Sequence, residues 1–308
     1  MIHHDIPRSR RSALRITGAA AFALAGCHLS PLHALSLVYD QPTGNWNVAA
    51  NWQNATRRVP TVDDSAFIRA GRAVTVDTDV GTAGIVYLGD NGAQGTLIVS
   101  NGASLNVAES FQVMRNSAAS NVVGTLTMDG GTLSATLMTV GGGAANAGNS
   151  SGTATISGGT LTAPITVGST GVATGFFNVM GSTAVISGSS FTVNSLGRVN
   201  FTFGSAGVSM LNYATGPASF ANGSLFGIDG SLYAGGAGDI TLVNSGDLTW
   251  GVDTDDVTIT GFTDFTTELI TSTNDDVILR LTAVPEPSAA LLLCVGMPLL
   301  ACRHRRRA

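Results

Sequence analysis

The chain has 308 residues, of which 11% are charged, 39 are glycine and none is lysine. All histidines and cysteines lie within 1–34 or 284–308, and the segment 35–284 carries 18 acidic residues against seven arginines, a net charge of −11. In that segment these counts exclude a Ser-His-Asp or Cys-His nucleophile, a zinc site with nitrogen or sulfur ligands and a Schiff-base lysine. They also argue against nucleic acid as a partner, because no basic cluster is present to neutralise phosphates. Hydrolysis by paired carboxylates is the common enzyme chemistry left open.

Residues 1–34 are typical of a signal peptide, since several arginines precede the short apolar run 16–26. Arg10 and Arg11 form a pair that resembles the twin-arginine export signal, which carries folded proteins. The segment 24–27 resembles a bacterial lipobox, in which Cys27 would be lipidated. An ordinary Sec signal cut after residue 34 is the alternative. All of these interpretations predict export.

Residues 35–70 differ from the rest of the chain in holding two of its three tryptophans, Trp46 and Trp52. We predict an N-terminal cap whose aromatic side chains pack in the core. The alternative is a platform on which the indoles stack against sugar rings. The order Trp-Asn, Asn-Trp, Pro, Asp-Asp resembles the opening of bacterial surface proteins with β-helical repeats, including autotransporter-like passenger domains.

Internal repeats occupy residues 71–239. The segment 124–133 recurs as 152–161 with seven of ten positions identical, and weaker copies give starts at 71, 95, 124, 152, 175 and 197. Each unit alternates apolar and polar residues on either side of a glycine turn, so that Leu126 and Met128 share one face. A period of about 20 to 30 residues suits one coil of a right-handed parallel β-helix. An antiparallel β-sandwich or meander is the alternative, for which Asn-Gly and Asp-Gly turns are ordinary signals.

Residues 240–283 are predicted to form C-terminal capping strands. Acid pairs stand at 63–64, 255–256 and 275–276, and one pair with a third acid could serve a polysaccharide hydrolase. All three fall in the predicted caps rather than on the coils, where a glycan groove would lie. Asp77 with Asp79, and the run 253–256, could bind calcium, but neither has the spacing of a calcium loop. We interpret these acids as solvated turn residues and predict no catalytic residue, no metal and no cofactor.

The last 25 residues have three parts in a fixed order. A proline turn comes first, then the apolar run 289–302, then a basic end. The turn consists of Val284, Pro285, Glu286, Pro287 and Ser288, and the basic end holds Arg303, Arg305, Arg306 and Arg307. The apolar run is shorter than the roughly 20 residues that span a bilayer comfortably. This tail resembles the PEP-CTERM sorting signal, which implies recognition and cleavage by the membrane protease exosortase. The family's members are associated with exopolysaccharide and biofilm.

These features together predict an exported structural or adhesin-like protein of a Gram-negative cell surface or extracellular matrix. It would lie transiently in the inner membrane, with exosortase and exopolysaccharide as its partners and no nucleic acid. A carbohydrate-binding module and a carboxylate-dependent polysaccharide hydrolase are the alternatives.

Overall fold

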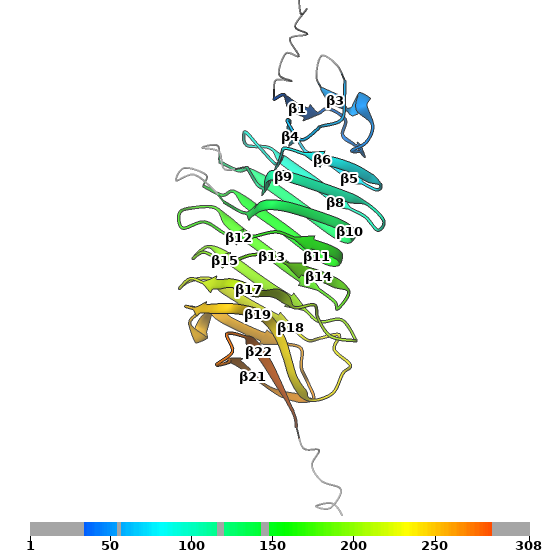
Figure 1. Ribbon diagram of the computed structural model, residues 1–308. Helices are drawn as coiled ribbons and strands as arrows, with labels where there is room; N and C mark the ends of the chain where they lie inside the picture. Colours follow the sequence, from blue (N-terminus) through cyan, green and yellow to red (C-terminus); the bar gives the residue numbers. More distant parts are fainter. Residues whose placement is uncertain (1–33, 54–56, 116–119, 143–147, 285–308) are drawn as a thin grey trace, which may run out of the picture. The chain divides into compact units, whose positions relative to one another are not determined.

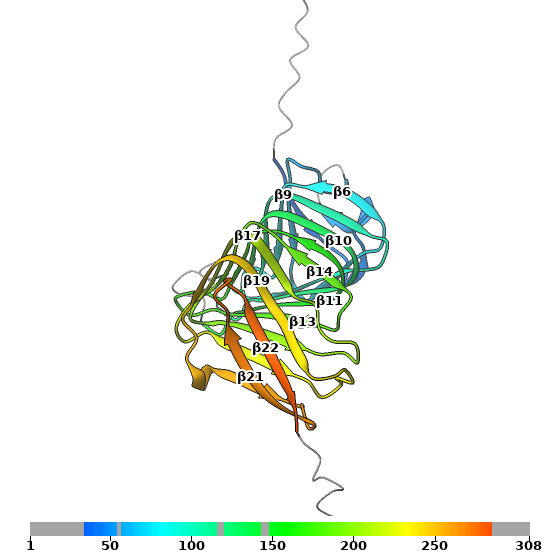
Figure 2. The ribbon, with the colours of Figure 1, turned by 60° about the horizontal axis from the view of Figure 1, so that its bottom comes forward.

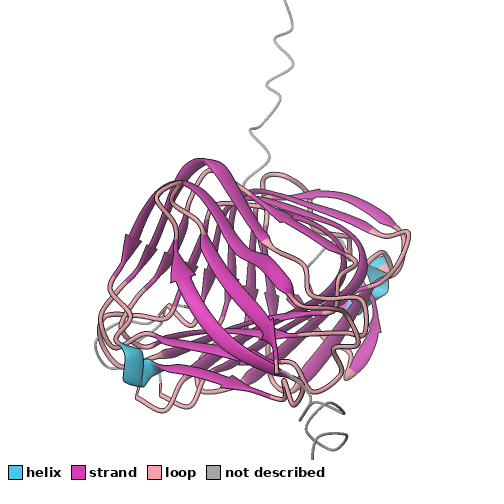
Figure 3. Ribbon diagram, turned by 90° about the horizontal axis from the view of Figure 1, so that it is seen from below, coloured by secondary structure: helices cyan, strands magenta, loops and turns pink. Residues whose placement is uncertain are grey.

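The computed structural model describes residues 34–53, 57–115, 120–142 and 148–284 (Figure 1). They form a β-solenoid of about eight turns whose strands are mostly parallel. The predicted all-β, parallel β-helical fold is therefore confirmed, and the antiparallel sandwich or meander is wrong. The coils enclose one core and present three faces, as the end-on view in Figure 3 shows.

The first face is a parallel sheet in which each coil contributes one strand or part of one. In stacking order its strands are β2 (Thr43–Asn45), β5 (Arg72–Val76), β8 (Gln94–Val99), β10 (Val123–Val140), β11 (Ser151–Thr162), β13 (Thr174–Met180), β16 (Gly197–Thr202), β18 (Leu225–Asp229) and β20 (Val257–Thr260). Strands β10 and β11 continue around a corner, so only their N-terminal halves lie on this face.

The other two faces stack in the same way. The second face holds β6 (Asp79–Ala83), the first part of β9 (Ser104–Val113), later parts of β10 and β11, β14 (Ala184–Ser187) and the first parts of β17 (Leu211–Phe220) and β19 (Gly238–Trp250). The third face holds β1 (Ser36–Tyr39), β4 (Ser65–Ile68), β7 (Ile85–Leu88), the ends of β9 and β10, β12 (Ile165–Val167), β15 (Phe191–Val193) and the ends of β17 and β19.

Antiparallel strands close both ends of the solenoid. At the N-terminal end β3 (Trp52–Gln53) pairs antiparallel with β1. The 3₁₀ turn η1 (Ala49–Asn51) directly precedes β3 in the chain. At the other end β21 (Phe265–Thr271) and β22 (Val277–Ala283) form a hairpin, and β22 pairs antiparallel with β19 (Figure 2). The prediction that capping begins at residue 240 was wrong in part, because β19 and β20 still stack in parallel as coil strands.

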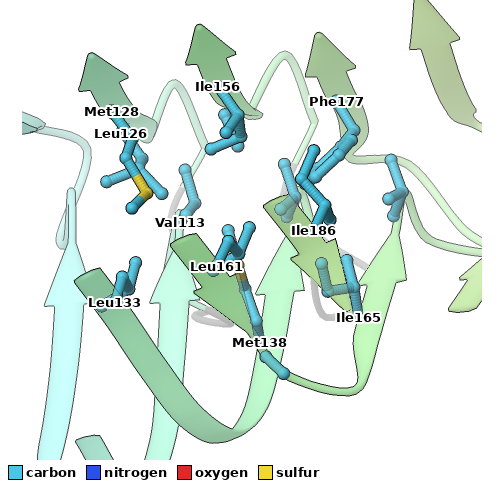
Figure 4. Close-up of a cluster of buried hydrophobic side chains, with 14 of the residues drawn as sticks. Val113, Leu126, Met128, Leu133, Met138, Ile156, Leu161, Ile165, Phe177 and Ile186 are labelled. Carbon is cyan, nitrogen blue, oxygen red and sulfur yellow. The ribbon is translucent and has the colours of Figure 1, made fainter. Parts of the chain in front are cut away.

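The core is filled by the inward residues of all three faces. Leu126 and Met128 point inward together, as the alternating pattern predicted, and both are fully buried. Figure 4 shows them pointing into the core, which Leu133 from the second face and Met138 from the third also line. Because each coil supplies only a few apolar side chains, burial is completed by the coils above and below it.

A stack of glycines fixes the register of the first face. Gly95, Gly124, Gly152, Gly175 and Gly197 lie directly above one another. A Cβ atom at Gly95 would lie 1.9 Å from the carbonyl oxygen of Ile68 in the preceding coil. Backbone therefore occupies the space that a side chain would need.

The predicted first repeat start, Gly71, was wrong by one residue. It is Arg72 that lies opposite Gly95, while Gly71 has a φ of +76° in the turn before the strand. Glycine is favoured at that position because it adopts a left-handed backbone without steric strain. The register of this coil is set instead by its inward valines, since Val74 and Val76 pair with Leu97 and Val99.

Candidate functional site

A groove of about 620 Å³, with a lining of mixed polar and apolar residues, crosses the first face over its last four coils. Its walls come from β13, β16, β18 and β20 and from the 3₁₀ turn η2 (Thr254–Asp256) that precedes β20. It is lined by Phe176, Asn178, Arg198, Asn200, Phe201, Thr202, Leu225, Phe226, Gly227, Ile228, Asp229, Asp255, Asp256, Thr258 and Thr260. The groove thus runs across the strands, along the direction in which the coils stack.

The groove follows from one row of outward-facing positions. Asn178, Asn200, Gly227 and Thr258 occupy the same register on consecutive coils. Gly227 leaves this row without a side chain, and a Cβ atom there would lie only 2.4 Å from Asn200 Oδ1. The Asn200 amide therefore lies over Gly227, in the groove.

Hydrogen bonds orient the amides of this row. Asn200 Nδ2 donates to Asn178 Oδ1 at 2.8 Å, and Asn178 Nδ2 donates to Thr155 Oγ1 at 3.3 Å. Within the described residues no donor bonds Asn200 Oδ1, so this chain of amides ends on a free acceptor. A polar group held in place on one side and unpaired on the other is suited to a ligand.

The neighbouring outward row supplies an aromatic ring and a cation. Phe176, Arg198 and Leu225 share its register, and the Arg198 guanidinium lies 5.5 Å from the centre of the Phe176 ring. Stacking on an aromatic face holds a guanidinium by cation–π attraction. The stack orients Arg198 while its exposed end can still donate hydrogen bonds.

Three aspartates complete the lining. Asp229 accepts a hydrogen bond from the backbone N–H of Ser231 at 2.9 Å. Asp255 and Asp256 lie in η2, directly before β20. The expectation that acid pairs lie away from the coils was therefore wrong for this pair, because η2 leads directly into a coil strand. With one arginine and three aspartates the lining is acidic overall.

Most of the backbone of the groove is already hydrogen-bonded, since among its four strands only β20 lacks a strand partner on one side. Strand β16 pairs with β13 on one side and β18 on the other, and β18 in turn pairs with β20. A ligand that lies along the groove must consequently be recognised mainly by side chains.

The tryptophans considered as a sugar platform lie elsewhere and are buried. Trp46 is 0% and Trp52 1% exposed, and their rings contact each other edge to face with centres 4.8 Å apart. Trp52 Nε1 donates to the Trp46 carbonyl oxygen at 2.8 Å. The platform hypothesis is wrong for this reason, and both side chains close the core at the N-terminal end.

The acid pair at Asp63 and Asp64 forms no catalytic dyad. Asp64 is buried in an ion pair with Arg58 and also accepts hydrogen bonds from Thr61 and from the N–H of Leu35. Burial raises the pKa of this carboxyl, but the hydrogen bonds together outweigh it and the pKa is lowered. Asp64 is thus a structural anion of the cap.

The remaining acids considered for catalysis or metal binding are also apart from one another. Asp275 and Asp276 lie in the turn of the β21–β22 hairpin. Hydrogen bonds from the N–H of Gly81 and the hydroxyl of Ser104 lower the pKa of Asp79. No three His, Cys, Asp or Glu side chains among the described residues gather closely enough to hold a metal ion.

The structure contains one cluster that the sequence patterns did not suggest. Asp90 is 1% exposed and forms ion pairs with Arg69 and Arg115, both at 2.9 Å. The Arg115 guanidinium also lies 5.1 Å from the ring centres of Phe67 and Tyr87. Because every charge here is paired within the cluster, we interpret it as a clamp between coils.

Comparison with protein-family models, curated proteins and solved structures found no match. In the part of the chain that the structure describes, no helix has the length and hydropathy needed to cross a membrane. Arg10, Arg11, Cys27 and residues 285–308 lie outside the described residues. Of the proposed sorting motif only Val284 is described, and it is half exposed with its N–H donating to the Asp264 carbonyl oxygen.

The sequence singled out Asp255 and Asp256 as an acid pair, but the other groove residues were missed because no local motif contains them. Phe176 lies on β13, and Arg198 and Asn200 lie one coil later on β16, more than 20 residues further along the chain. The signal that could have found them was their common offset from the repeat starts at 175 and 197.

Proposed function

We propose that this protein is an exported structural component of a Gram-negative cell surface or extracellular matrix that associates with exopolysaccharide. Its proposed mechanism is display. A folded solenoid presents long rows of hydroxyl and amide groups to the surrounding glycan, and an exosortase-type protease releases it from the inner membrane.

The observation that carries this proposal is the repetition of polar side chains along the solenoid. On the third face one outward row holds only hydroxyl and amide residues over six coils. In stacking order these are Gln112, Thr139, Thr166, Thr192, Ser219 and Thr249. Parallel strands repeat about every 4.8 Å, so the row offers hydrogen-bonding groups at regular short intervals. Such a surface is suited to many weak contacts with a polymer.

The sorting part of the proposal rests on the tail. The Pro-Glu-Pro turn, the short apolar run and the four terminal arginines resemble the PEP-CTERM signal. Val284, where the described solenoid ends, is half exposed, as expected of a residue next to a cleavage site.

Intact mass tests the sorting part. We expect the native protein from the medium or the matrix fraction to end near Val284 and to lack Arg303 to Ala308. The same spectrum shows whether Cys27 begins the chain and carries lipid. A mature protein that keeps the terminal arginines in the envelope fraction would contradict the release step.

The display role includes the absence of catalysis, which a second assay tests. The wild-type protein incubated with neutral and acidic polysaccharides should release no new reducing ends. Release that is lost in Asp229→Asn or Asp256→Asn would instead identify the acids of the groove as catalytic residues.

A further inference from the structure

We propose that the groove on the first face binds a neutral glycan chain lying along the stacking direction of the coils. The inference deepens the proposed function, on which it rests, by assigning polysaccharide recognition to a specific site. It also replaces the tryptophan platform, whose rings are buried.

The direction and length of the groove fit an extended polymer. Its lining comes from four consecutive coils, β13, β16, β18 and β20. Three steps of about 4.8 Å separate four parallel strands, so the groove extends roughly 14 Å across them. One coil step is close to the length of one pyranose unit in an extended chain, and the groove therefore covers about three units.

The chemistry of the lining suits sugar hydroxyls. Arg198 donates only, Asn200 Oδ1 accepts, and the carboxylates of Asp255 and Asp256 accept as well. Planar groups of this kind can bond two neighbouring hydroxyls of one ring at once. The half-buried Phe176 contributes by holding the Arg198 guanidinium stacked on its ring.

Two other ligand classes fit less well. A polyanion such as a uronate polymer would meet three aspartates against one arginine, and the like charges would repel it. A peptide that binds as an added strand needs a free sheet edge. Of the four groove strands only β20 has no strand partner on its outer side, and a strand added there would lie beside β20 rather than along the four coils.

Gly227 offers a variant that blocks the groove and keeps the fold. Its φ is not in the left-handed region, and the atom that a new Cβ would meet is the movable end of Asn200. Threonine already occupies the next position of the row, Thr258, and favours strands. Gly227→Thr should therefore fold normally with a filled groove.

The experiment measures binding of the full chain to defined glycans by affinity electrophoresis and calorimetry. The probes are neutral β-glucan, mannan and galactan with their hexasaccharides, and polygalacturonate is the acidic comparison. We expect at least one neutral glycan to bind, with affinity reduced tenfold or more in Gly227→Thr and in Arg198→Ala. Thr127→Ala, in the same outward row but beyond the groove, should bind like wild type.

Two results would overturn the inference. One is the absence of binding to every neutral glycan of the panel, and the other is equal affinity of wild type and a folded Gly227→Thr variant. Circular dichroism and the unfolding midpoint establish that each variant is folded. A protein correctly processed at the tail but without groove binding would refute the site alone, whereas failed processing with intact groove binding would refute the sorting proposal alone.

Discussion

At Gly152 the stacked coils leave no room for a side chain. A Cβ atom there would lie 2.2 Å from the Val113 carbonyl oxygen and 2.3 Å from the N–H nitrogen of Gly141. Both are backbone atoms of well-packed neighbours, so they cannot turn aside as a flexible side chain would. We expect Gly152→Ala to lower the free energy of unfolding by about 3 kcal/mol, as strong overpacking does.

Gly102→Ala is the matched control for this prediction. Gly102 has a φ of +80°, but a Cβ atom added there would have no neighbour within 4 Å. Alanine there incurs only the left-handed backbone strain, about 1 to 2 kcal/mol. Guanidinium unfolding followed by circular dichroism compares the two, and a smaller loss for Gly152→Ala would show that the coils can separate to admit a methyl group.

The buried carboxylate of Asp64 makes the stability of the N-terminal cap pH-dependent. Its pKa is lower in the folded protein than in the unfolded chain, so its stabilising effect is present above the unfolded value of about 3.9 and is lost as pH falls through the folded pKa. We expect the thermal midpoint to fall on acidification below about pH 4 by more in wild type than in Asp64→Asn. Equal acid sensitivity of the two proteins would assign the effect to other carboxylates.

The N-terminal cap closes the first coil with two indoles in different hydrogen-bonding states. Trp52 Nε1 donates to the Trp46 carbonyl oxygen, whereas Trp46 Nε1 is buried with no partner among the described residues. Trp46→Phe removes an unpaired donor, whose burial is itself unfavourable, while Trp52→Phe removes a formed hydrogen bond. We expect Trp52→Phe to lose about 1 to 2 kcal/mol more of unfolding free energy than Trp46→Phe, measured by urea unfolding. The reverse order would mean that ring packing rather than hydrogen bonding decides the cap.

Strand pairing in the middle coils could be predicted from the sequence because the same residues recur at the same register. The glycines at 95, 124, 152, 175 and 197 align in the structure as they do in the repeats. The next coil was missed because Ser224, followed by Leu225, stands where the pattern has glycine. Inward apolar residues such as Phe226 and Ile228 keep the register there, and they are less distinctive than a glycine in a single sequence.

The groove could not be predicted by the same reasoning. It depends on a departure from the repeat, since Gly227 is the one position of its row on these four coils that lacks a side chain. Acids at 255 and 256 reach it only because the turn η2 directly precedes β20. Local sequence patterns are enough to predict a single coil. Predicting a site that several coils form also requires knowing how those coils are aligned on one another.

In the whole solenoid the stability of each coil depends on the coils next to it. Each coil contacts mainly its two neighbours, so damage at one place should spread along the stack and weaken with distance. The described residues contain no cysteine, so these coils are held together by core packing, backbone hydrogen-bond ladders and side-chain contacts such as the ion pairs of Asp90. The position of a substitution should therefore decide which strands open.

Hydrogen exchange of two variants tests this dependence on position. Trp52→Ala opens the N-terminal end of the core, and we expect amides of β1 and β4 to lose protection while β16 and β18 keep it. Gly152→Ala weakens the stack in its middle, so protection should fall most in β10 and β11 and the two ends should open independently. Equal loss of protection in every coil for both variants would show that the solenoid unfolds as one cooperative unit. The groove lies on β13 to β20. If the Trp52→Ala variant opens only the N-terminal coils, as we expect, it should still bind glycan, because the coils that form the groove stay folded.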